Sequence, residues 1–273
     1  MGLRVNTNLA SLNAQRNLTQ VSSRLTGNYS RLSSGLRIAT ASDDAAGLAI
    51  SERMRSQIRS FGAAARNTQD GISLVQTAEG ALNETSNILS RMRELAIQAA
   101  NGTLSATDRD TINVEVTALI EELDRIADAT EFNGIALLDG TATTTAIQVG
   151  LNDGDTIDVS LQDTTAATLG VDGVDVTTAA LASSSLADLD AAIDSINTTR
   201  GGLGAVQNRL TSSYTSILNV RENLSAAESR IRDVDVAMET ADLTRNSILQ
   251  QAAVSVLAQA NVQPQIALSL LQG

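Results

Sequence analysis

The stretch of sequence that decides the fold is LDAAIDSINTTRGGLGAVQNRLTSSYTSILNVRENLSAAESRIRDVDVAMETA, residues 189–241. Large apolar residues recur in it every seven positions: Leu189, Ile196, Leu203, Leu210, Ile217, Leu224, Ile231 and Met238. The residue three positions after each of them is small or β-branched. This repeat is typical of a long helix that packs along a partner helix. It predicts one continuous helix over residues 189–241, roughly 80 Å long at about 1.5 Å per residue, which belongs to a rod rather than to a compact globule.

Three glycines, Gly201, Gly202 and Gly204, lie inside this predicted helix. Each lowers helix stability by about 1 kcal/mol relative to alanine. They indicate either a locally weak turn, or a bend or close approach of a neighbouring helix. The sequence favours neither interpretation.

The N-terminal half supplies partner helices for this rod. Apolar residues with helical spacing predict a helix from about Asp43 to Ala100, with Ser42 as its N-cap. A second set of apolar residues with helical spacing predicts a helix from about Ala106 to Thr130. Residues 131–134 are expected to end this helix.

Residues 135–176 have a different pattern. Ile147, Val149 and Leu151 alternate with polar residues, and the alternation resumes at Ile157 after a turn at 152–154. This pattern predicts a β-hairpin, and the acidic residues of its turn fit a hairpin turn better than a calcium loop. We expect the threonine- and alanine-rich stretches 141–145, 164–168 and 177–185 to be loops or short linkers.

The composition excludes many classes of catalytic site. The chain has no histidine, no cysteine and no lysine, and only 1% of its residues are aromatic. Catalytic triads based on histidine, thiol chemistry, ordinary zinc sites, Schiff bases and phosphate-binding P-loops therefore cannot be built. We expect no catalytic site, no cofactor and no metal ion. The acidic pair Asp43–Asp44 is better explained by a helix start than by catalysis.

Charge is distributed unevenly along the chain. Residues 1–42 carry five arginines and no acid, and residues 246–273 carry no charged side chain. The other 14 arginines and all 31 acids lie between, so this middle segment has a charge of −17 within a total of −12. The negative total and the scarce aromatics disfavour nucleic acid as a partner.

Both ends of the chain have a helical pattern. Near the C-terminus two apolar stripes coexist, which means that the helix is apolar on more than one side. Because the N-terminal segment can cover one side only, we expect other copies of the chain to bury the remaining apolar sides of this helix. We expect no membrane span, since the apolar runs are too short, and no cleavable secretory signal.

Several motifs carry a resemblance to the bacterial flagellin family. They occur in the family's order over nearly the whole chain: VNTNLASLNAQRNL (5–18), RLSSGLRI (31–38), DDAAG (43–47), DGISL (70–74), TAEGALNE (77–84), FNG (132–134), LGAVQNR (203–209), residues 248–260 and LSLL (268–271).

The resemblance implies a mainly α fold with paired terminal helices, a coiled-coil-like helical rod and a small β-hairpin region. Residues 1–41 and 241–273 would form an inner filament-core domain. Residues 42–240 would form a rod domain with a hairpin near 135–176. No room remains for outer variable domains.

The implied function is that of a structural subunit, which polymerises into the extracellular bacterial flagellar filament used for swimming. The residues expected to hold copies together in the filament core are apolar: Leu9, Leu12, Leu25, Leu249, Val254, Val256, Leu257, Leu268, Leu270 and Leu271. The alternative is a hook–filament junction protein, which shares the terminal pattern but caps rather than polymerises.

The resemblance also implies partners. The chain would be secreted through the type III flagellar export apparatus, with an export chaperone bound to its C-terminal segment, and would meet the filament cap and hook-junction proteins. A host Toll-like receptor for flagellin would bind the rod through Arg91, Leu95 and Glu115, with Arg93 and Glu94 beside them.

Overall fold

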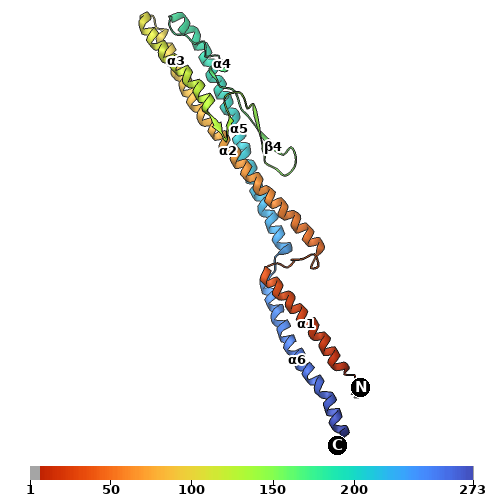
Figure 1. The fold of residues 1–273 in the computed structure, drawn as a ribbon. Helices are drawn as coiled ribbons and strands as arrows, with labels where there is room; N and C mark the ends of the chain where they lie inside the picture. Colours follow the sequence, from red (N-terminus) through yellow and green to blue (C-terminus); the bar gives the residue numbers. More distant parts are fainter. Residues whose placement is uncertain (1–6, 273) are drawn as a thin grey trace. The chain divides into compact units, whose positions relative to one another are not determined.

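The computed structural model describes the backbone of residues 7–272 and the side chains through residue 262. Helices form most of this part of the chain, which confirms the mainly α prediction (Figure 1). The elements in chain order are α1 (Leu9–Ser34), α2 (Ala45–Ala99), α3 (Ala106–Ala129), β1 (Glu131–Phe132), β2 (Ile135–Ala136), β3 (Thr144–Gln148), β4 (Thr156–Ser160), α4 (Ala166–Leu169), α5 (Ala179–Arg232) and α6 (Val236–Gln272). The chain divides into a terminal unit, residues 1–56 with 223–273, and a central unit, residues 57–222.

The heptad positions form the core of the central unit. Leu189, Ile196, Leu203, Leu210 and Ile217 are all at most 4% exposed. Fully buried residues face them from the other long helices of this unit: Leu82 and Leu89 on α2, and Val116 and Leu123 on α3. Each such side chain contributes about 1.5–3 kcal/mol by leaving water, so the predicted seam holds this unit together.

The predicted helix over residues 189–241 is wrong in one respect, because it is not continuous. Helix α5 ends at Arg232 and α6 begins at Val236. The side chain of Asp235 accepts hydrogen bonds from the backbone N–H groups of Ala237 and Met238, at 2.9 and 3.1 Å, and so caps α6. The heptad spacing continues across the break, but Met238 is 69% exposed.

A short backbone pairing replaces the helical hydrogen bonds lost at this break. The backbone N–H of Arg37 donates to the carbonyl oxygen of Arg232 at 2.7 Å, and that of Val234 donates to Gly35 at 3.0 Å. Carbonyl groups at a helix end need donors from outside the helix. The segment that follows α1 supplies them.

Two helix starts differ from the prediction. Helix α2 begins at Ala45 rather than near Asp43, and its cap is Asp44 rather than Ser42, because Asp44 accepts the N–H of Gly47 at 2.9 Å. Helix α5 begins at Ala179, within a stretch predicted as a loop. There the Thr178 hydroxyl accepts the N–H of Leu181 at 3.2 Å, so a threonine cap decides the boundary.

The glycines inside α5 do not interrupt it. A Cβ atom added at Gly201, Gly202 or Gly204 would meet no atom within 4 Å outside the helix's own neighbouring backbone. Among the described residues, therefore, no neighbouring helix approaches closely at these positions. Of the two sequence interpretations, close approach within one chain does not hold.

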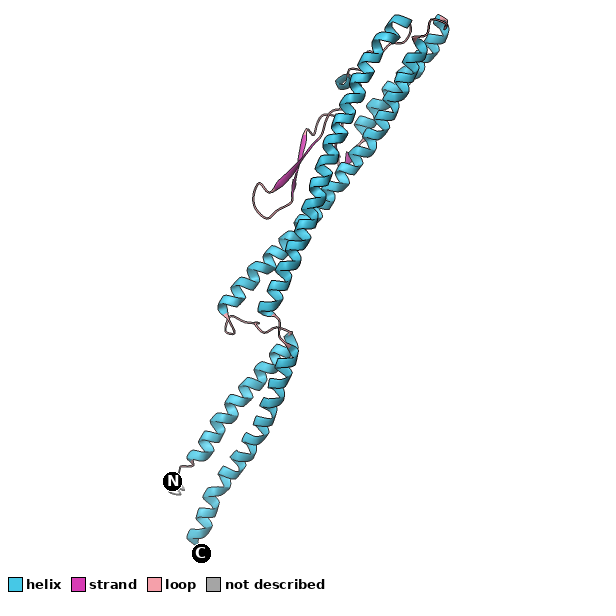
Figure 2. Ribbon diagram, turned by 180° about the vertical axis from the view of Figure 1, so that it is seen from behind, coloured by secondary structure: helices cyan, strands magenta, loops and turns pink. Residues whose placement is uncertain are grey.

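The predicted hairpin is present, but its first strand lies earlier in the chain than expected (Figure 2). Strand β3 spans Thr144–Gln148, so it includes residues 144–145, which were predicted as a loop, and leaves out Val149 and Leu151. Strands β3 and β4 pair antiparallel with Ile147 opposite Ile157, and Ile157 and Val159 point into the core. The acidic turn residues bond to their own loop, since the carboxylate of Asp155 accepts the N–H of Asn152 at 2.9 Å. This is the expected hairpin turn.

A second, two-residue strand pair was not predicted. Strands β1 and β2 flank Asn133 and Gly134, whose φ angles are 52° and 78°. Positive φ at both central residues is what a tight Asn-Gly hairpin turn requires. From the sequence, this dipeptide was predicted only to end a helix. The expected loop at 164–168 likewise contains the short helix α4.

Candidate functional site

The terminal unit is built on helices α1 and α6, which lie side by side (Figure 1). Ala14, Leu25 and Ala260 are each at most 7% exposed. At one end of the pair, the amide of Asn8 donates to the carbonyl oxygen of Ala260 at 2.7 Å and Ser11 Oγ donates to Asn261 Oδ1 at 2.8 Å. Asn8 also caps α1 by accepting the N–H of Ser11. One asparagine thus starts α1 and ties it to α6.

A cluster of polar residues also joins α1 to α6, nearer the C-terminal end of α1. We call it the Asn28 cluster, and its members are Asn28, Arg31, Glu239 and Asn246. Glu239 Oε1 accepts hydrogen bonds from Asn28 Nδ2 at 2.6 Å and from Arg31 Nε at 2.8 Å. Asn28 Oδ1 accepts from Asn246 Nδ2 at 2.9 Å. Asn28 is 2% exposed and Asn246 is 9% exposed. Since buried polar groups need specific partners, this cluster fixes how α1 aligns with α6.

The pKa of Glu239 is lowered, chiefly by the hydrogen bond from Arg31 and also by that from Asn28, against the opposing effect of burial. A lowered folded-state pKa contributes stability that is present above the unfolded value and is lost as the pH falls through the folded value. We therefore expect helix loss in the terminal unit on acidification below about pH 4.3, the ordinary value for glutamic acid.

A far-UV circular dichroism titration checks this expectation. The variant Glu239→Gln lacks the titrating group, so its helix loss on acidification should be smaller than that of the parent chain. Glu222→Gln, at an exposed position, is the matched control and should titrate like the parent. Identical titrations of parent and Glu239→Gln would contradict the linkage.

The outer surfaces of α1 and α6 are unusually apolar for a single chain. The large apolar residues exposed by more than a third of their surface are Leu9, Leu12, Val236, Met238, Ile248, Leu249, Val254, Val256 and Val262. An open groove of about 740 Å³ runs along α1, and its lining residues include Leu9, Leu12 and Thr19. Large exposed apolar patches mark interaction sites.

The predicted filament-core residues fall into three groups. Leu9, Leu12, Leu249, Val254 and Val256 are exposed and available to another molecule. Leu257 is half-buried, and Leu25 is 7% exposed because it packs inside the α1–α6 pair. Leu268, Leu270 and Leu271 lie outside the residues whose side chains the structure describes.

Sequence reasoning missed Ile248, which is 61% exposed. It belongs to neither of the two stripes used for the prediction. The available signal was the residue itself, a large apolar side chain in a segment that carries no charge.

A second group of predicted site residues lies in the central unit. Arg91 Nη2 donates to Glu115 Oε1 on α3 at 2.8 Å, and Arg91 Nη1 donates to Glu94 Oε2 at 3.2 Å. These bonds raise the pKa of Arg91, with the bond to Glu115 the largest cause. The side chains of Arg91, Glu94 and Glu115 are 51%, 69% and 47% exposed. The structure thus brings these three predicted residues together at the surface.

The other two predicted residues of this group lie differently. Arg93 points to α5, where its Nε donates to Asp190 Oδ1 at 2.6 Å, and this bond raises the pKa of Arg93 and lowers that of Asp190. Asp190 was not predicted. Leu95 is 2% exposed and belongs to the core of the unit, next to Met92, so its side chain is not offered at the surface.

Comparison with known proteins gives the family. Residues 5–143 match the model of the bacterial flagellin N-terminal helical region, and residues 186–271 match that of the bacterial flagellin C-terminal helical region. The chain belongs to the flagellin family. The resemblance noted in the sequence is thereby confirmed.

Individual flagellins agree with the family models. The chain is 48% identical over 270 residues to a flagellin of Halalkalibacterium halodurans, covering 98% of this chain and 99% of the relative. It is 46% identical to a flagellin of Bacillus subtilis, covering 99% and 100%. A crystal structure of Bacillus cereus flagellin superposes with a TM-score of 0.52 at 40% identity, covering 60% of this chain and 94% of that one.

Flagellins are structural proteins, and the geometry of this family member fits that class. Among the described residues, no group of three or more acidic, histidine or cysteine side chains could hold a metal ion. No helix in that part of the chain combines the length and apolarity needed to cross a membrane. The exposed apolar residues on α1 and α6 are the feature of this unit that a function has to explain.

Proposed function

We propose that this chain is a structural subunit of the extracellular bacterial flagellar filament and that the exposed apolar surface of α1 and α6 is its polymerising surface. The observation that carries the proposal is the exposure of Leu9, Leu12, Ile248, Val254 and Val256 in a single folded chain. Burying such a side chain against another copy contributes about 1.5–3 kcal/mol. Contacts between unlike surfaces of identical copies generate a helical filament when the rotation between copies does not close into a ring.

We further propose which part of the chain lies inside the filament. Residues 1–41 and 241–273 would form the core domain, and residues 42–240 would form the rod outside it. The charge distribution supports this arrangement, since residues 1–42 contain no acid, residues 246–273 contain no charge, and the middle carries −17. Charged side chains are costly to bury without partners, so the acidic middle belongs in contact with solvent.

The experiment that tests the function is polymerisation of the purified chain on short filament seeds, followed by electron microscopy. A filament subunit elongates the seeds in proportion to the protein added. A hook–filament junction protein would bind seed ends and stop, and that outcome would contradict the proposal.

The exposed apolar surface also supports a proposal for export. Before assembly, the exposed apolar residues must be shielded from water. An export chaperone bound to residues 246–272 would shield them until the chain reaches the type III flagellar export apparatus. The filament cap and the hook-junction proteins would then meet the same helices at the two ends of the filament. A chain that ends at Arg245 should lose binding to the flagellin chaperone of the same bacterium in isothermal titration calorimetry, and undiminished binding would contradict this proposal.

For the host receptor, we propose that the exposed charged residues Arg91, Glu94 and Glu115 make the contacts. Arg93 lies beside them, and Leu95 holds α2 in position by packing in the core. Arginines that are buried on binding carry a large share of interface energy. We expect Arg91→Ala to lower the response of cells that report the Toll-like receptor for flagellin by about tenfold or more. The control Arg125→Ala removes an arginine that pairs only with Glu122 on its own helix. Equal responses to both variants would contradict the assignment.

A further inference from the structure

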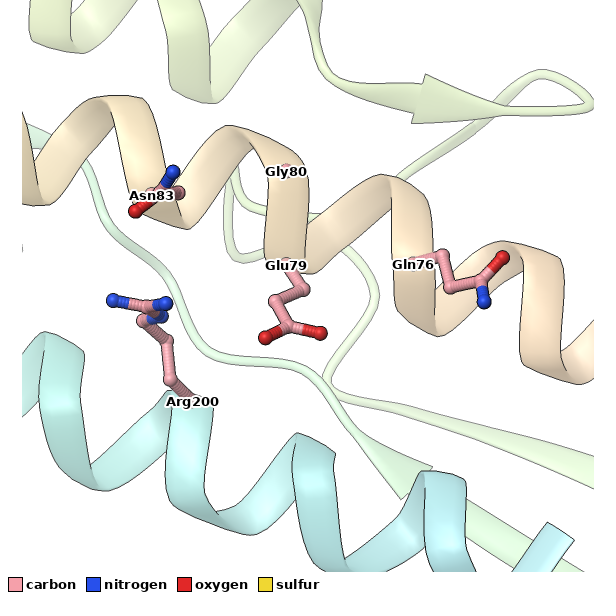
Figure 3. A pocket seen from close by; sticks show the side chains of 5 residues that line it. All are labelled: Gln76, Glu79, Gly80, Asn83 and Arg200. Atoms are coloured by element: carbon pink, nitrogen blue, oxygen red, sulfur yellow. The ribbon is translucent and has the colours of Figure 1, made fainter. Parts of the chain in front are cut away.

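An open pocket lies between α2 and α5 in the central unit (Figure 3). Its volume is about 250 Å³, and the residues that line it are Gln76, Glu79, Gly80, Asn83 and Arg200. The side chains of Glu79 and Arg200 extend into the same space from the two facing helices. The pocket plays no part in the functions discussed above.

Arg200 is unlike the other arginines of this unit that point at neighbouring helices. Its Nε atom is buried and has no hydrogen-bond partner among the described residues. Arg91 and Arg93, in contrast, each bond a carboxylate on another helix. A buried donor without an acceptor is destabilising, and natural proteins rarely leave one. None of the salt bridges among the described residues joins Glu79 to Arg200.

Of the residues that line the pocket, Gly80 has no side chain to fill it. A Cβ atom at Gly80, which lines the pocket, would meet nothing within 4 Å, and the same holds for Gly201 and Gly202, which follow Arg200 directly. All three glycines are exposed. Gly80 carries a cost in helix stability without making room for any part of its own chain. The room is therefore available to another molecule.

The donors and acceptors of the pocket define what fits it. Arg200 offers N–H donors, Glu79 offers carboxylate acceptors, and Gln76 and Asn83 offer amides. The two charges balance, which disfavours a free ion of either sign. A neutral carboxamide or peptide group is complementary, because its oxygen accepts from the guanidinium while its N–H donates to the carboxylate.

We propose that this pocket receives a carboxamide or peptide group from a second copy of this chain and so forms a polar contact between rods in the filament. The inference rests on the proposed function, since polymerisation is what brings copies of this chain against one another. A pocket of this size accepts one asparagine or glutamine side chain or a short peptide segment. The contact adds directional hydrogen bonds to the nondirectional burial of apolar surface on α1 and α6.

Gly80→Gln tests the proposal by filling the pocket from within. The single chain should fold and melt at the same temperature as the parent or higher, because the space is open and glutamine favours helix over glycine. On seeds, however, we expect its critical concentration for polymerisation to rise about tenfold. Gly62→Gln is the matched control, because Gly62 lies in the same helix, also has nothing within 4 Å and is outside the pocket. The control should polymerise like the parent.

Arg200→Gln provides the second, independent variant. It removes the guanidinium that we assign to the contact, so it too should raise the critical concentration while leaving the melting temperature of the single chain unchanged. Parental polymerisation by both Gly80→Gln and Arg200→Gln would overturn the inference and leave the filament function standing. A lower melting temperature for Arg200→Gln and Glu79→Gln, with unchanged polymerisation, would show an internal ion pair instead. Failure of the parent itself to polymerise would overturn both proposals.

Discussion

A chain that ends at Arg245 is expected to keep its central unit folded but to form no filaments. The deletion removes α6 from Asn246 onward, and with it the apolar residues Ile248, Val254 and Val256 that the proposal buries between copies. It also removes the carbonyl oxygen of Ala260 and the amide of Asn246, which tie α1 in place. Helix α1, left without most of its partner helix, loses the tertiary packing that supplies most of the stability of helices in proteins.

Two measurements check this expectation. Circular dichroism should show reduced helix content, with the cooperative melting of the central unit retained, because its core residues all lie within 57–222. Electron microscopy after seeding should show no elongation at concentrations where the full chain polymerises. Filaments of normal length from the truncated chain would contradict the assignment of α6 to the polymerising surface.

Replacing Asn28 by alanine is expected to weaken the α1–α6 pair by about 2 kcal/mol. Glu239 loses its bond from Asn28, and the amide of Asn246, 9% exposed, is left without its acceptor. Leaving buried polar atoms unpaired costs more than the bonds themselves contribute. The effect should stay local, because the cluster lies wholly in the terminal unit.

Hydrogen exchange followed by mass spectrometry measures this local effect. Amides of α1 and of the first part of α6 should exchange roughly thirtyfold faster in Asn28→Ala, which is what about 2 kcal/mol of opening free energy implies. Asn13→Ala is the matched control, because Asn13 is exposed and bonds only Arg16 on its own helix. Equal exchange in the two variants would show that the cluster does not hold the helices together.

The sequence predicts the long helices and the hairpin because hydrophobic periodicity controls both. The buried leucines of the heptad repeat and the alternation around Ile147 and Ile157 are local patterns with a direct structural meaning. The break between α5 and α6 escapes such a pattern, since an apolar repeat can continue across a helix end. What decides the break is Asp235, whose carboxylate bonds the backbone of the next helix.

The candidate site is less predictable from sequence, for a physical reason. An apolar residue on a helix favours burial, but hydrophobic periodicity does not show whether the same chain or another chain buries it. Leu25 and Val256 both fit the helical stripes, yet the first is buried in its own chain and the second is 59% exposed. Leu95 shows the same ambiguity, because it shares a face of α2 with Met92 in the core. Arg200 and Glu79 come together only through the packing of α2 on α5.

The burial of α6 on polymerisation is the central claim, and thiol reactivity tests it most directly. The chain has no cysteine, so Val256→Cys introduces a single thiol at a position that is 59% exposed in the single chain. If α6 is buried between copies, a maleimide should label this thiol rapidly in the monomer, should label it only slowly in the filament, and should label it rapidly again once the filament is dissolved. Equal labelling rates in monomer and filament would contradict it.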